Sequence, residues 1–125
     1  MNAMDDARNV LARISAFDFG ASGIEPLKGG SNNRSFLVRT AHAWFVLRLS
    51  DPANVPVGVD RRRELRIHEA ASDAGIASTI VYASVDDGIL LTEYVAGAQL
   101  RFEELERRVV VEQLASLLHA VHELP

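Results

Sequence analysis

Apolar residues recur every three or four positions in three segments of the chain, and this spacing predicts three helices. The segments are residues 5–17, 61–74 and 102–123. Asp60 stands just before the second segment, and aspartate is a favoured residue at a helix N-cap. The first segment is clearly amphipathic, so we expect its apolar face to lie against another part of the protein.

Five short runs of β-favouring residues lie between these helices. They are residues 24–27, 35–39, 44–49, 80–85 and 89–95. Short connections join neighbouring runs, and strands joined by tight turns pair antiparallel. The order helix, three strands, helix, two strands, helix therefore predicts an α+β fold, a five-stranded antiparallel sheet with helices packed on it.

The composition is that of an ordinary globular domain. The chain has 125 residues, of which 48% are hydrophobic and 24% are charged. Its net charge of −4 argues against a nucleic-acid binder that relies on phosphate neutralisation. The chain has no cysteine, which excludes disulfides and thiolate metal sites, and no apolar run reaches the length of a membrane span. We expect a cytoplasmic protein by default.

The connection between the first two predicted strands is rich in glycine and in polar side chains. After Lys28 it contains Gly29, Gly30, Ser31, Asn32 and Asn33. Consecutive glycines let backbone N–H groups approach an anion without obstruction by Cβ atoms, and the Ser and Asn side chains add donors. An ordinary polar hairpin loop has the same composition, so this stretch alone does not define a phosphate site.

A charged residue interrupts the central predicted strand. Arg48 shares one face of the strand with Trp44 and Val46, and the other face is also apolar, so the strand is expected to be covered on both sides. A buried cation needs a partner. Glu64, on the second helix, falls on the same helical stripe as Ile67, Ala71 and Ala74. The pattern allows an Arg48–Glu64 ion pair, but it equally allows Arg48 to reach solvent while Glu64 pairs with His68.

Two features of the last helix have structural explanations. His119 and His122 lie three residues apart near its end, where cationic residues suit the helix dipole, and no further ligands surround them, so we predict no metal site. The apolar stripe of this helix is wide, which indicates that more protein covers it, unless it closes the core of this domain. A homodimer through this stripe would use Val110, Leu114, Leu117, Leu118 and Val121.

Five motifs stand in order along the chain. They are Ile24-x-x-Leu27-x-Gly29-Gly30-x-Asn32-Asn33, Val46-Leu47-Arg48-Leu49, Arg61-x-x-Glu64, Leu91-Thr92-Glu93-Tyr94-Val95-Ala96-Gly97 and Leu114-Ala115-x-x-Leu118-His119. Together they resemble the amino-terminal lobe of the choline kinase and aminoglycoside phosphotransferase family, which shares the protein-kinase-like fold. The resemblance covers the chain from about Ile24 to His122.

The resemblance implies a nucleotide site for ATP with Mg²⁺. Gly29–Asn33 would cover the phosphates, and Arg48 would stand where protein kinases carry the phosphate-contacting lysine of the third strand. Glu64 would orient Arg48, which favours the ion pair over the alternative. Glu93 and Val95 would offer backbone groups to adenine at the hinge between two lobes.

The same resemblance also shows what is missing. Family members carry a His-x-Asp catalytic loop and a later Mg²⁺-binding Asp in a second lobe, and no His of this sequence is followed two residues later by Asp. The resemblance therefore assigns residues 1–98 to the nucleotide-binding lobe and residues 99–125 to the hinge exit and the first helix leading toward an absent lobe. We assign no catalytic residue and no metal ligand, and we expect this chain alone to be inactive.

The resemblance thus implies an ATP-dependent phosphotransferase, represented by its nucleotide-binding lobe. The acceptor would be the hydroxyl of a small molecule such as choline, an amino alcohol, a sugar or an aminoglycoside, bound through the missing lobe. The alternative is a complete, non-catalytic interaction or nucleotide-binding module that dimerises through its last helix. Neither nucleic acid nor a membrane is an expected partner.

Overall fold

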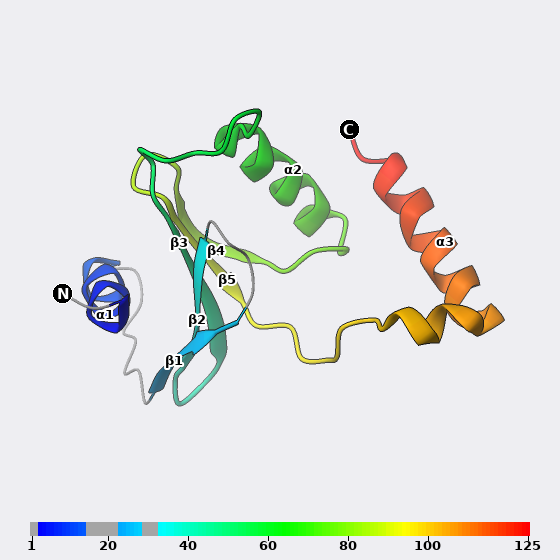
Figure 1. The fold of residues 1–125 in the computed structure, drawn as a ribbon, viewed down its shortest axis with the longest axis horizontal. Helices are drawn as coiled ribbons and strands as arrows, with labels where there is room; N and C mark the ends of the chain where they lie inside the picture. The colour runs from blue at the N-terminus through cyan, green and yellow to red at the C-terminus, as the bar shows by residue number, and fades with distance from the viewer. Residues whose placement is uncertain (1–2, 15–22, 29–32) are drawn as a thin grey trace.

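The computed structural model describes residues 3–14, 23–28 and 33–125 (Figure 1). The helices are α1 (Ala3–Arg13), α2 (Arg61–Asp73) and α3 (Arg108–His122), with a short 3-10 helix η1 (Phe102–Glu106) before α3. The strands are β1 (Gly23–Leu27), β2 (Asn33–Arg39), β3 (Trp44–Ser50), β4 (Ile80–Ser84) and β5 (Ile89–Glu93).

The five strands form one antiparallel sheet in the order β1-β2-β3-β5-β4, which places β3 at its centre. Leu47 of β3 lies opposite Phe36 on one side and opposite Leu91 on the other. The predicted α+β fold with a five-stranded antiparallel sheet is confirmed. The predicted helix over 102–123 was wrong in one detail: Arg107 has an extended backbone and separates η1 from α3.

One face of the sheet carries the hydrophobic core, and α1 covers it. Alternation along β3 turns every second side chain toward this face, where it is buried. The buried apolar residues on this side are Ala7, Val10, Leu11 and Ile14 from the α1 region and Phe36, Val38, Phe45, Leu47, Leu49, Ile89 and Leu91 from the sheet. The apolar face predicted for the first helix therefore packs on the sheet.

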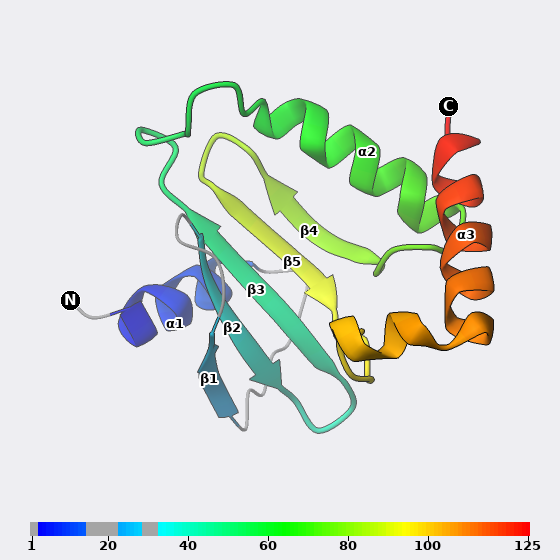
Figure 2. The same ribbon diagram turned by 45° about the vertical axis from the view of Figure 1, so that its right-hand side comes forward.

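Helix α2 lies on the opposite side of the sheet from α1 (Figures 1 and 2). Asp60 caps it as predicted, because its carboxylate accepts hydrogen bonds from the backbone N–H groups of Arg62 and Arg63, both at 3.1 Å. The predicted sheet-facing stripe was displaced by one position. Ile67 is 57% exposed, whereas Leu65 and His68 face the sheet and line a cavity there.

A contact from the middle of α2 accounts for the displacement of that stripe. The His68 ring nitrogen Nε2 lies 2.9 Å from the backbone oxygen of Ser78, in the segment that leads to β4. This contact holds the His68 side of the helix toward the sheet, so that residues 61, 65 and 68 follow one inward stripe.

Helix α3 lies beyond the end of the sheet and is reached from β5 through residues 94–101 and η1 (Figures 1 and 2). Several of its apolar residues are a little under half exposed: Val109, Val111, Leu117, Leu118 and Val121. Among the residues that the structure describes, no helix combines the length and the apolar character needed to cross a membrane.

Candidate functional site

The site is centred on Arg48, on the face of the sheet away from α1. Its neighbours Leu47 and Leu49 are buried on the α1 face, so alternation places the Arg48 side chain beneath α2, where it is half-buried. Burial lowers the pKa of Arg48 below its ordinary value. The nearby Glu64 carboxylate raises this pKa in part, and the Arg61 guanidinium lowers it again. Arg48 is thus a cation in a poorly solvated position.

A cavity of about 170 Å³ separates α2 from the sheet beside Arg48. Arg61, Glu64, Leu65 and His68 line it from the helix, and the β4–β5 hairpin forms its other wall. The lining is mixed, with cationic, anionic and aliphatic side chains. A small anionic group would find hydrogen-bond donors here, since guanidinium groups are strong donors to oxyanions.

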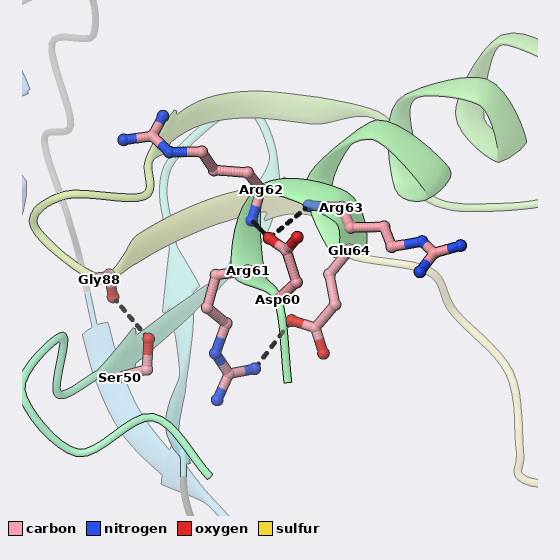
Figure 3. Close-up of polar contacts among 7 residues, drawn as sticks. All are labelled: Ser50, Asp60, Arg61, Arg62, Arg63, Glu64 and Gly88. Atoms are coloured by element: carbon pink, nitrogen blue, oxygen red, sulfur yellow. Dashed lines mark hydrogen bonds and ion pairs between the residues drawn. The ribbon is translucent and has the colours of Figure 1, made fainter. Parts of the chain in front are cut away.

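Glu64 pairs with Arg61 within the first turns of α2. The Arg61 Nη1 atom lies 2.8 Å from the Glu64 Oε2 atom (Figure 3). The Arg61 side chain is only 14% exposed, while that of Glu64 is 45% exposed. Within the described part of the chain, Arg48 forms no ion pair with Glu64, and His68 is bonded to Ser78 instead.

The sequence placed Arg48 and Glu64 in one neighbourhood and Arg61 in a motif with Glu64, but it assigned Arg61 no role. The signal was present, since Arg61 and Glu64 are three residues apart on a helix, a spacing that brings side chains together.

The segment that follows β5 carries backbone groups that a ligand could bind, at the end of β3 where Trp44 and Phe45 lie. The Glu93 N–H donates to the Thr79 oxygen at 2.9 Å, and the Tyr94 N–H donates to the Trp44 oxygen at 3.0 Å. Val95 is 67% exposed, and its backbone N–H has no hydrogen-bond partner in the described ranges. The Val95 N–H is thus available to a ligand, and a carbonyl oxygen such as that of Glu93 has two lone pairs with which to accept hydrogen bonds.

The glycine-rich stretch lies for the most part outside the described residues. This applies to Gly29, Gly30, Ser31 and Asn32. Asn33 begins β2, and its backbone lies opposite Ser50 at the end of β3. The start of β2 therefore lies at the same end of the sheet as Ser50.

No metal site emerges from the residues that the structure describes, since they contain no group of three or more His, Asp or Glu side chains able to hold an ion. Asp86 pairs with Arg62 at 2.6 Å, and Asp87 accepts a hydrogen bond from the Ser84 hydroxyl at 2.8 Å. We assign no Mg²⁺ ligand in this part of the protein.

The fold is a five-stranded antiparallel sheet with α2 over the face that carries Arg48, and the chain leaves the sheet after β5. This arrangement defines a protein-kinase-like amino-terminal lobe. The sequence model of the phosphotransferase enzyme family, APH, matches residues 23–125. The chain belongs to this family, which confirms the resemblance carried by its motifs. No curated protein sequence matches the chain.

Solved structures of two kinases are similar to this one. A choline/ethanolamine kinase family protein from Mesorhizobium loti is 25% identical, with a TM-score of 0.70 and a match that covers 98% of this chain. The choline kinase LicA from Streptococcus pneumoniae is 20% identical over 70% of this chain, with a TM-score of 0.56, which shows a shared fold. The matches span 40% and 30% of the lengths of these two proteins.

Proposed function

We propose that this chain binds ATP as the nucleotide-binding part of a small-molecule phosphotransferase. The acceptor we propose is a hydroxyl group of a small molecule such as choline, an amino alcohol, a sugar or an aminoglycoside. Membership of the phosphotransferase enzyme family supports the reaction class, and the similarity to a choline/ethanolamine kinase family protein favours an amino alcohol. The cytoplasm is the compartment we propose.

The main support for this proposal is the burial of Arg48 and its lack of an ion-pair partner among the described residues. Its guanidinium is half-buried on the central strand, lies next to a cavity, and forms no ion pair with the described residues. Desolvation of a cation costs free energy that an anionic partner can offset. A phosphate group is such a partner, because its oxygens match the planar fork of a guanidinium.

The β5 exit supports a position for the base. Phe45 lies opposite Glu93 and Arg48 lies opposite Leu90, so the two ends of the site are three residues apart along the strands. At the usual rise of a strand this is about 10 Å. The adenine would accept a hydrogen bond from the Val95 N–H and donate one to the Glu93 carbonyl, and the ribose and phosphates would extend toward Arg48.

When bound, Mg²⁺ would neutralise charge on the phosphates. The described residues offer it no ligand set. The side chains at this site bind and orient the nucleotide. The proposal therefore concerns binding, and its test measures binding.

The test is a calorimetric titration of the chain with Mg-ATP, followed by nuclear magnetic resonance of the same complex. We expect saturable binding, with shifts of both the Val95 backbone N–H and the Arg48 Nε–H resonances. Adenosine, which has no phosphates, should shift only Val95, and inorganic triphosphate should shift only Arg48. Absence of saturable binding, or shifts confined to α3, would contradict the proposal.

We infer a second candidate function, self-association through α3, from the exposure of its apolar side chains. Leu117 is 46% exposed, Leu118 49% and Val121 43%. Burying them against a second copy would remove apolar area from water. Light scattering after size exclusion should then give the mass of a dimer, and Leu118→Glu should return a monomer, whereas a monomeric wild-type chain would exclude this function.

A further inference from the structure

Arg61 differs from the two arginines that follow it. Arg62 and Arg63 are exposed, and their side chains point away from the Arg61–Glu64 pair (Figure 3). The Arg62 side chain is 63% exposed and reaches Asp86 in the β4–β5 turn. Arg61 has only 14% of its side chain exposed and lines the cavity beside Arg48. The Arg61 side chain is therefore part of the buried site, whereas those of Arg62 and Arg63 are on the protein surface.

Two cationic side chains, Arg48 and Arg61, and one anionic side chain, Glu64, line the cavity. Glu64 pairs with Arg61 and favours the charged form of Arg48, whereas Arg61 opposes that form, so the two guanidinium groups repel each other. An anion that enters the cavity would relieve this repulsion.

The direction of the strands gives the order of the groups along the site. The Val95 exit adjoins the Phe45 end of β3, Arg48 lies three residues further on, and Ser50 ends the strand. Arg61 also lines a neighbouring hollow with Ser50, Pro52 and Val85 that Arg48 does not reach, so Arg61 lies toward the Ser50 end. A nucleotide whose base is at Val95 and whose phosphates extend past Arg48 would bring its last phosphate toward Arg61.

We propose that Arg61 is a second phosphate-binding residue, which recognises the terminal phosphate of a nucleoside triphosphate while Glu64 holds its guanidinium in place. This inference rests on the proposed function, because it extends the same site by one residue. Its consequence is selectivity for the triphosphate over the diphosphate and monophosphate. A guanidinium has enough donors to bond a carboxylate and a phosphate at once.

The experiment compares the affinities of ATP, ADP and AMP for wild type, Arg61→Gln, Arg61→Ala and Arg63→Ala by calorimetry. Gln keeps a donor for Glu64 but removes the charge, and Arg63→Ala removes an equal charge from the exposed side of the same helix turn. We expect both Arg61 variants to lose roughly tenfold or more in ATP affinity, with AMP affinity unchanged, because a hydrogen bond to a charged group has about this value. Arg63→Ala should preserve the ATP-to-ADP ratio.

The outcomes separate this inference from the proposed function. If wild type and the Arg61 variants bind ATP with the same preference over ADP, the role of Arg61 is wrong and ATP binding stands. If the wild type binds inorganic triphosphate through Arg61 but no nucleotide, the anion site stands and the proposed function fails. If it binds neither, both are wrong. A uniform loss for all three nucleotides would make Arg61 merely structural and overturn the inference, and circular dichroism would show whether that variant has unfolded.

Discussion

Gly88→Ala is expected to lower the free energy of unfolding by about 3 kcal/mol or more. Gly88 closes the β4–β5 turn with a φ of 70°, in the left-handed region that favours glycine. A Cβ atom there would lie 1.9 Å from the backbone oxygen of Ser50 and 2.9 Å from its carbonyl carbon. Because the obstacle is backbone, the hairpin would have to move away from the end of β3.

The same close approach forms part of the site. The Ser50 N–H donates to the Gly88 oxygen at 2.8 Å, and the Ser50 hydroxyl approaches the same oxygen at 3.4 Å (Figure 3). Both residues line the cavity beside Arg48. Separating the hairpin from β3 would break these hydrogen bonds and open the wall of the cavity.

Gly58→Ala is the matched control for this change. Gly58 has a φ of 83°, but a Cβ atom built there has no neighbour within 4 Å. It should therefore incur only the cost of the left-handed backbone, about 1–2 kcal/mol. Urea unfolding of the three chains measures both losses, and an equal loss in the two variants would show that Gly88 has no special contact with Ser50.

Local pattern predicted the fold where local signals agree with the tertiary structure. Alternation in residues 44–49 predicted which side chains of β3 share a face, and Asp60 was a sufficient signal for the start of α2. The break at Arg107 could not be predicted in this way. Apolar spacing continues across it, and only the backbone shows that η1 ends there.

The site was predicted less completely, for a reason that Arg61 illustrates. The sequence pattern places Arg48 on the central strand and Glu64 near the start of α2. Which of their side chains meet depends on how α2 is rotated about its own axis relative to the sheet. A rotation by one position turned Leu65 and His68 inward, and it left Glu64 to pair with Arg61. Ion pairs at helical spacing differ in their stabilising free energy by only tenths of a kcal/mol. Sequence spacing alone therefore does not decide whether Glu64 pairs with Arg61 or with His68.

Arg48→Met should raise the stability of the chain while it removes nucleotide binding. Burial is the largest influence on the Arg48 pKa and lowers it, so the charged form is less favourable in the folded protein than in water. Methionine fills a similar space without a charge, and it avoids the free-energy cost of burying a cation. We expect a gain of roughly 1 kcal/mol in the free energy of unfolding.

The loss of binding and the gain in stability must occur together for this interpretation of Arg48 to hold. The variant lacks the guanidinium donors, so ATP affinity should fall at least roughly tenfold. Urea unfolding and calorimetry measure the two effects, with Arg63→Met as the control, because Arg63 is exposed and should change neither appreciably. A less stable Arg48→Met variant would mean that Arg48 holds the fold together, and unchanged ATP affinity would mean that the phosphates bind elsewhere. The two results together would support the proposal that Arg48 occupies this position in order to bind an anion.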